Sequence, residues 1–254
     1  KTSEFERFNL RSNLDIPLSD KIKVGTSISG SHGIGHYPNS NGFYGRGGVI
    51  SQALAAAPTI PVYDDEGNPY TSQEAVTDGL GWLQNPLTLL EEFNDDRKVT
   101  DIFSNNYLEF NIVEGLTFRI TAGIQYSTST IKIWRSSEVP FFTTLNYPAT
   151  AGATKTQNLN WLNENTINYK KIIGKHNIDI LAGFTSQKDS YERLSAGASG
   201  FPTNNVTYLS GGIVNAGTHI LSEWAIVSLL STIFIEIWRG VPLITVLFMA
   251  SNMF

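Results

Sequence analysis

The sequence predicts an all-β protein whose antiparallel hairpins form part of a transmembrane β-barrel, as an open curved sheet within this chain. Apolar and polar residues alternate with period two over stretches of about ten residues, the pattern of a barrel strand. Short turns alternate with long connections. The 16% charged content is below the roughly 25% usual in soluble domains. A mean hydropathy of −0.11 is too polar for a bundle of membrane helices.

The first predicted hairpin joins residues 7–18 to residues 22–29 through a turn at 19–21. In its first strand, large apolar residues lie at even-numbered positions: Phe8, Leu10, Leu14, Ile16 and Leu18. Polar residues lie at the odd-numbered positions between them: Arg7, Asn9, Arg11, Asn13 and Asp15. Successive side chains of a strand point to opposite faces. The hairpin therefore presents one apolar and one polar face.

Two more hairpins follow the same plan. The second joins 107–113 to 116–126 through a turn at Val113-Glu114-Gly115, and the third joins 159–169 to 176–184. A further strand is expected to begin near Ser222. Strands of soluble sandwiches usually have about 5–6 residues, whereas membrane barrel strands need about 9–11. The lengths therefore favour a membrane barrel.

The organisation follows from these strands. Residues 1–229 are expected to form a partial barrel of six to seven strands. The long connections, interpreted as extracellular loops, are expected at about 31–98, 134–158 and 186–221. Periplasmic turns of such barrels are short and their extracellular loops long. An export signal, if the protein is exported, would precede Lys1.

The sequence predicts no catalytic, cofactor-binding or metal site, and it assigns no ligand-binding residue. Cysteine is absent, and the net charge of −5 has no basic cluster, which argues against nucleic acid. We expect neither an enzyme nor a cofactor.

Two groups of possible metal ligands lie in the first connection. Residues 64–68 could hold calcium, but their spacing does not match an EF-hand, so a turn is favoured. His32 and His36 have a metal-binding spacing on a helix, but Gly33 and Gly35 between them favour a loop. A short helix is expected from Asn85 to Glu92, with Pro86 in its first turn.

Aromatic residues concentrate in or beside the connections, where they could stack on sugars or anchor the barrel at the membrane interface. They are Tyr63, Tyr70, Trp82, Trp134, Phe141, Phe142 and Tyr147. The anchoring interpretation suits Tyr126 and Trp134, because both lie near a strand end.

Several short motifs resemble SusC/RagA-type TonB-dependent transporters over roughly residues 1–229. The motifs are residues 8–15, Ala55-Ala56-Ala57-Pro58 followed by 60–64, Asn85-Pro86 with Leu90-Glu91-Glu92, residues 161–166, 174–177 with 181–185, and Ser222-Glu223-Trp224. Their order and spacing make the resemblance fairly specific.

The resemblance implies a plugged barrel of roughly 22 strands in the cell outer membrane. It implies import of oligosaccharides or peptides driven by TonB, a SusD-like surface lipoprotein as partner, and contact with outer-membrane lipid. The plug and the segment that contacts TonB would lie upstream of Lys1. The alternative is a structural or adhesive barrel without transport, and an upstream plug would discriminate the two.

The tail, residues 230–254, departs from the barrel pattern. Its apolar residues no longer alternate, and its length suits a membrane helix, although an unusual apolar strand is the alternative. Residues 235–244 resemble a segment of amino-acid ABC-transporter permeases. Taken alone, the tail would indicate an inner-membrane permease, but the polarity of the remaining chain argues against that. We hypothesise a chimera joined near Leu229 to Ile233.

Overall fold

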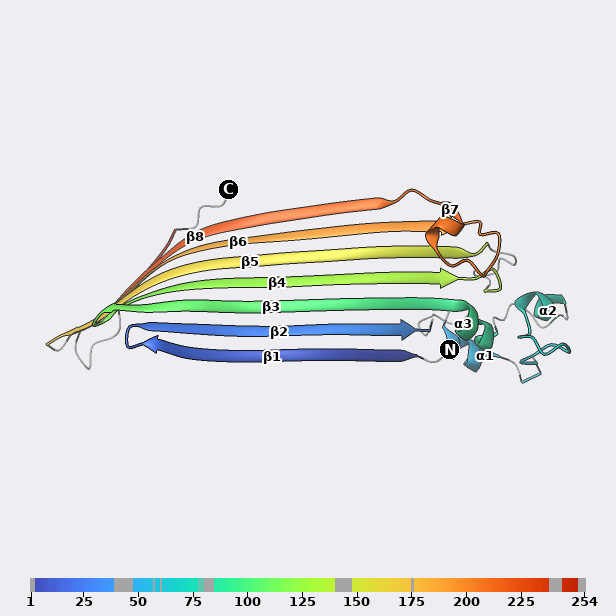
Figure 1. Ribbon diagram of the computed structural model, residues 1–254, viewed down its shortest axis with the longest axis horizontal. Helices are drawn as coiled ribbons and strands as arrows, with labels where there is room; N and C mark the ends of the chain where they lie inside the picture. Colours follow the sequence, from blue (N-terminus) through green and yellow to red (C-terminus); the bar gives the residue numbers. More distant parts are fainter. Residues whose placement is uncertain are drawn as a thin grey trace.

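One antiparallel sheet makes up almost the whole structure, a computed structural model (Figure 1). It describes residues 3–38, 48–56, 58–59, 61–77, 79, 85–139, 148–174, 176–237 and 244–250. The strand order is β1-β2-β3-β4-β5-β6-β8-β9, and β7 pairs with β6 beside this path. Each long strand pairs with the next one along the chain. This open, curved, all-β sheet confirms the predicted fold class.

The long strands run side by side and have 16 to 24 residues each. They are β1 (Glu4–Ser19), β2 (Ile22–Tyr37), β3 (Phe93–Val113), β4 (Leu116–Arg135), β5 (Thr150–Ile173), β6 (His176–Ser199) and β8 (Thr218–Ile237). The short strands are β7 (Ile213–Val214) and β9 (Ile244–Ala250). The helices α1 (Val49–Ala55), α2 (Ser72–Thr77) and α3 (Pro86–Glu92) and the 3-10 turn η1 (Leu209–Gly211) gather at the loop end of the sheet (Figure 1).

Three tight turns join the hairpins at the other end of the sheet, as predicted. Gly115 in the β3–β4 turn and Gly174 in the β5–β6 turn have φ values of +81° and +60°. Only glycine adopts this left-handed region without strain. Gly115 is also crowded, because a Cβ there would overlap the carbonyl oxygen of Lys170.

The strands reach further toward the loops than the alternation predicts. The intervals between them are 38–92, 136–149 and 200–217, each shorter than the corresponding predicted loop of about 31–98, 134–158 or 186–221. The reason is that the loop-side halves carry polar residues on both faces. Backbone pairing continues there without an apolar alternation to reveal it.

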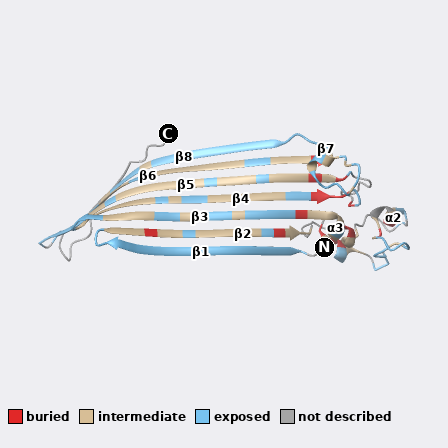
Figure 2. Cartoon of the chain, in the orientation of Figure 1, coloured by how far each residue is buried: buried red, intermediate tan, exposed pale blue. Residues whose placement is uncertain are grey.

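Side-chain burial is concentrated at the loop end (Figure 2). Trp134 is only 5% exposed and packs with Ala149 and Ala151, and its ring meets that of Phe201 edge-on at 4.9 Å. Leu209 completes this cluster. The prediction that Trp134 anchors the membrane interface is wrong, because neighbouring chain segments cover the ring.

The tail is strand rather than helix where it is described. β8 pairs with β6 continuously from Ser195↔Thr218 to His176↔Ile237, and β9 pairs with β8. Within the described ranges, no helix is long and apolar enough to cross a membrane. The helical prediction is wrong there, because the free edge of β6 supplies hydrogen-bond partners that a strand satisfies.

Candidate functional site

The register sorts the strand side chains into two faces. In one row Ile16 pairs with Val24, Val24 with Leu108, and Leu108 with Ile120. Such rows form an apolar band on the half of the sheet nearer the tight turns. The band comprises Phe8, Leu10, Leu14, Ile16, Val24, Ile28, Ile102, Leu108, Phe110, Phe118, Ile120, Ile124, Tyr126, Leu159, Trp161, Ile167, Tyr169, Ile180, Phe184, Val227 and Leu229.

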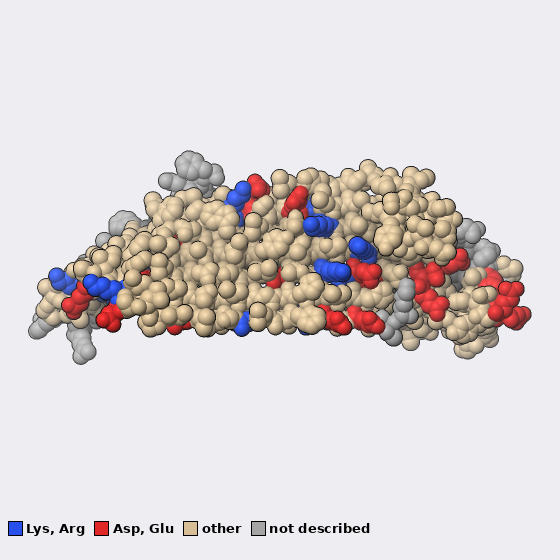
Figure 3. Space-filling view, in the orientation of Figure 1, with Lys and Arg blue, Asp and Glu red and all other residues tan. Residues whose placement is uncertain are grey.

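The apolar band is largely open to its surroundings. Leu10 is 74% and Phe8 65% exposed, although both are large apolar residues. Charged side chains are sparse between the tight-turn end and the middle of the strands on the face drawn in Figure 3. Soluble monomers rarely expose an apolar patch of such extent. The band therefore suits contact with lipid.

The opposite face, called the polar face here, carries a network of hydroxyl, amide and carboxylate groups. Asp101 accepts hydrogen bonds from Ser31 at 3.3 Å and Ser127 at 2.6 Å. Asn160 donates to Asp189 at 3.1 Å and accepts from Gln187 at 3.2 Å. The bonds of Asp101 join β2, β3 and β4, and those of Asn160 join β5 and β6. Such a surface can form repeated hydrogen bonds with a polar molecule that passes along it.

A charged cluster lies on the polar face near the tight turns. The Tyr107 hydroxyl donates to Asp15, and its ring lies across Gly25, where a side chain would collide with it. The Arg119 guanidinium lies 3.9 Å from the centre of the Tyr107 ring and forms an ion pair with Glu109 at 3.3 Å. The cluster ties β1, β2, β3 and β4 together.

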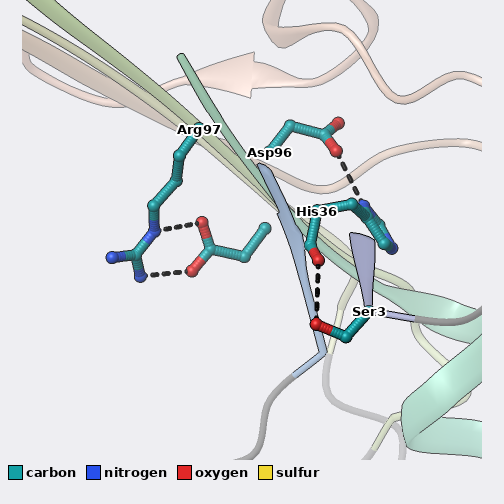
Figure 4. Close-up of polar contacts among 5 residues, drawn as sticks. Ser3, His36, Asp96 and Arg97 are labelled. Carbon is teal, nitrogen blue, oxygen red and sulfur yellow. Dashed lines mark hydrogen bonds and ion pairs between the residues drawn. The ribbon is translucent and has the colours of Figure 1, made fainter. Parts of the chain in front are cut away.

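The loop end of β2 and β3 holds separate polar contacts (Figure 4). His36 Nδ1 lies 2.8 Å from Asp96 Oδ1, and Arg97 donates two hydrogen bonds to Asp95, at 2.8 and 2.6 Å. His32 pairs with Thr100 at 2.8 Å. The described residues include no group of three His, Cys, Asp or Glu that could hold a metal.

His32 and His36 therefore lie on strand β2, and the prediction of a loop there is wrong. His32, Ile34 and His36 continue the parity of the apolar band, and the intervening glycines fit extended backbone. Four residues along a strand span about 13 Å, too far for both rings to share one ion.

The acidic stretch at 64–68 forms a turn, as favoured. Asp64 Oδ1 accepts from the backbone N–H of Glu66 at 2.9 Å and of Asn68 at 2.8 Å. Tyr63 and Pro69 form an isolated β-bridge around it. The Asp64 carboxylate closes the turn.

The helix predicted from Asn85 to Glu92 is confirmed as α3. Asn85 caps it by accepting from Leu87 N at 2.9 Å, and its amide donates to Val62 O at 2.9 Å and Tyr70 O at 3.0 Å. Tyr70 is buried and Tyr63 exposed. The remaining loop aromatics, Trp82, Phe141, Phe142 and Tyr147, lie outside the described residues.

The turn at 64–68 should loosen in acid. Burial raises the pKa of Asp64, but hydrogen bonds from Asn68, Glu66 and Gly67 outweigh it and hold that pKa below the ordinary value of 3.8. A lowered folded-state pKa stabilises the turn above the unfolded pKa, and this stabilisation is lost as pH falls through the folded value. Amide hydrogen exchange of Glu66 and Asn68 should accelerate below about pH 4 in excess of the intrinsic rate. An Asp64→Asn variant should show no such pH step, and a step of equal size in both proteins would contradict the assignment.

Comparison with known proteins agrees with this architecture. No protein-family model matches the chain. TonB-dependent receptor P3 of Formosa agariphila is 31% identical over 241 residues, covering 92% of this chain and 23% of that protein. TonB-dependent receptor P26 of the same organism is 32% identical over 208 residues, covering 82% of this chain and 20% of that protein. The chain thus spans about a quarter or less of these relatives.

Solved structures share the fold. The RagAB peptide importer in its open-open state superposes with a TM-score of 0.72 at 17% identity, covering 92% of this chain and 26% of that one. Its closed-closed state gives 0.69 with the same identity and coverage. At this level of identity the likeness shows the fold alone.

A shorter match concerns a different kind of protein. The inner membrane amino-acid ABC transporter permease protein YhdY of Escherichia coli K12 is 72% identical over 32 residues, covering 13% of this chain and 9% of that protein. This is the class of protein that the tail resembles. By sequence, the chain otherwise belongs to the TonB-dependent receptors, and its fold matches part of the RagAB structures.

Proposed function

We propose that residues 1–229 form part of the wall of an outer-membrane transporter that imports nutrients and draws its energy through TonB. The observation that carries the proposal is the two-faced sheet. Its apolar band is open on one side, and its hydrogen-bonded polar face lies on the other. In a closed barrel the first side would meet lipid and the second would line the lumen.

The free edges of the sheet support a larger assembly. Backbone N–H and C=O groups at a sheet edge cost several kcal/mol each if they stay unpaired in hydrocarbon. β1 lies at one edge of the described sheet. We therefore place this chain as an arc of a barrel whose other strands complete the pairing. Receptor relatives about four times longer support this placement.

For the cargo we propose oligosaccharides or peptides, captured with a SusD-like surface lipoprotein. The amides and hydroxyls of the polar face, such as Asn160, Gln187 and Ser127, suit neutral polar cargo. A peptide importer among the structural neighbours supports the peptide option. The competing proposal is a structural or adhesive barrel without transport.

Uptake by cells tests this function. Cells that carry the full-length gene should accumulate a fluorescent oligosaccharide or peptide from a mixed library, and cells that lack the gene or TonB should not. Accumulation that persists without TonB would contradict the energy source. Surface attachment that depends on the gene, with no accumulation of any library member, would favour the adhesive barrel.

We also propose that the tail, residues 230–254, was joined to the barrel segment near Leu229 to Ile233. The permease match supports a junction, because a barrel and an inner-membrane helix use different export routes. Its 32 residues are more than residues 230–254 contain, so a match that includes the tail begins upstream of Leu229. Long-read sequencing of the source DNA across this region tests it. Reads that continue from Trp224 into further alternating strands are expected. Reads that pass unbroken from Trp224 through the codon of Phe254 would show that the junction belongs to the gene.

A further inference from the structure

Three lysines gather beyond the apolar band on the same face of neighbouring strands β3, β4 and β5. Lys98 and Lys155 both pair with Thr130, one from each side. Lys132 lies two residues beyond Thr130 and therefore on the same face. Lys98, Thr130 and Lys132 line a hollow of about 550 Å³, and Thr130 and Lys155 line an adjoining one of about 450 Å³.

These lysines have no ion-pair partner among the described residues, while other charges nearby are paired. Asp96 pairs with His36 at 2.8 Å, and Glu192 pairs with His219 at 3.0 Å. Lys188, on the same face, pairs with Glu223 at 3.2 Å.

Like charges on neighbouring strands destabilise a sheet. Diagonal neighbours such as Lys132 and Lys155 lie roughly 7–8 Å apart, within reach of a single anion. The hollow that Lys98 and Lys132 line also holds the carboxylates of Glu4, Glu6 and Asp96. Asp96 lies directly across from Lys132, so the lysines border acidic groups on their β1 and β2 side. A bound anion would relieve the repulsion among the lysines.

The height of the site above the apolar band identifies the anion. Lys98 lies four residues beyond Ile102, and Lys155 four beyond Leu159, where Ile102 and Leu159 are the last apolar residues of the band on their strands. Four residues advance about 13 Å along a strand, or about 10 Å along the membrane normal at a tilt near 40°. That height lies just outside a polar headgroup layer about 5–8 Å thick, and lysine side chains reach back toward it.

We propose that Lys98, Lys132 and Lys155 bind the phosphate groups of lipid headgroups in the surface leaflet. The inference rests on the proposed function only for the orientation of the apolar band toward lipid. Cargo is a poor candidate occupant, because it would pass along the opposite, polar face. The site would thus attach a phosphorylated lipid to the outer wall of the barrel.

Titration of the detergent-solubilised full-length protein with lipid A, followed by native mass spectrometry, tests the site. The variant carries Lys98→Gln, Lys132→Gln and Lys155→Gln together. Each lysine near an anionic surface contributes on the order of a fivefold gain in affinity, so we expect the loss of all three to weaken binding roughly 100-fold. The matched control carries Lys21→Gln, Lys170→Gln and Lys171→Gln, three exposed lysines at the tight turns, and should bind like the parent.

Three outcomes would overturn the site: equal loss in variant and control, no loss in either, or equal binding of dephosphorylated lipid A. Inorganic phosphate that displaces lipid A at equimolar concentration would show that a free anion, not a lipid, is the ligand. If the triple variant does not fold, Lys155→Gln alone replaces it, with about fivefold weakening expected. Failure of the parent protein to form a barrel, read from heat-modifiable electrophoretic mobility, would instead contradict the proposed function.

Discussion

Replacement of Ile120 by arginine should prevent the barrel from inserting or leave it severely destabilised. Ile120 lies in the apolar band, in the row between Leu108 and Asn165, near the middle of the ten-residue stretch that would cross the hydrocarbon. An arginine on the lipid side at that depth costs about 2–4 kcal/mol. Urea unfolding of the full-length protein in lipid vesicles should show a lower midpoint, and outer-membrane fractions should contain less of it.

The neighbouring residue supplies the control. Thr121 pairs with Tyr107 and Glu164 on the polar face, where an arginine would project into water in the lumen. Thr121→Arg should insert normally and shift the unfolding midpoint little. Equal damage from both substitutions, or greater damage from Thr121→Arg, would contradict the assignment of the two faces.

Replacement of Gly115 by alanine should destabilise the β3–β4 turn by roughly 2–5 kcal/mol. The left-handed conformation costs a residue with a Cβ about 1–2 kcal/mol, and forcing that Cβ against the Lys170 carbonyl adds about 1–3 kcal/mol of overpacking. Gly115 also accepts a hydrogen bond from Lys170 N at 2.7 Å, so relief of the collision would weaken this contact. The urea midpoint of the full-length barrel measures the loss.

Gly174→Ala is the matched control for this collision. Its φ of +60° imposes the same conformational strain, but no atom lies within 4 Å of the added Cβ. We expect a loss of only about 1–2 kcal/mol. Similar losses at Gly115 and Gly174 would show that the close approach of the Lys170 carbonyl has no energetic consequence.

The part of the fold that faces lipid could be predicted, because lipid imposes a local rule on the sequence. From Phe118 to Tyr126 every second residue must be apolar or small, and the period is visible without knowledge of the partner strands. The tight turns were predictable for a similar reason, since Gly115 stands where only glycine fits. Each of these signals lies within a few residues.

The loop-side halves of the strands could not be predicted from alternation. Around His32 and His36 one face of β2 carries only Ile34 as an aliphatic residue, and the other carries Ser31 and two glycines. This stretch is too short of apolar residues to distinguish a paired strand from a loop. Trp134 meets Phe201 across 67 residues of sequence, and its burial depends on that distant contact. A tryptophan near a strand end looks the same in sequence whether it is anchored in lipid or covered by a loop.

The candidate lysine site was invisible in the sequence because it depends on register. Lys98, Lys132 and Lys155 are separated by more than twenty residues each and form no basic run. Only the pairing of Thr130 with both Lys98 and Lys155 brings them together. A site composed of one residue from each of three strands therefore requires the sheet to be known.

The most direct test of the account is spin labelling of single cysteines along Leu116–Tyr126 of the full-length protein in lipid bilayers. This stretch contains no native cysteine. Labels at Phe118, Ile120 and Ile124 should collide mainly with oxygen dissolved in lipid, and labels at Arg119, Thr121 and Gln125 with a water-soluble paramagnetic reagent. This alternation with period two would confirm β4 as a barrel strand between lipid and lumen. Equal accessibility of both sets to the water-soluble reagent would contradict the account.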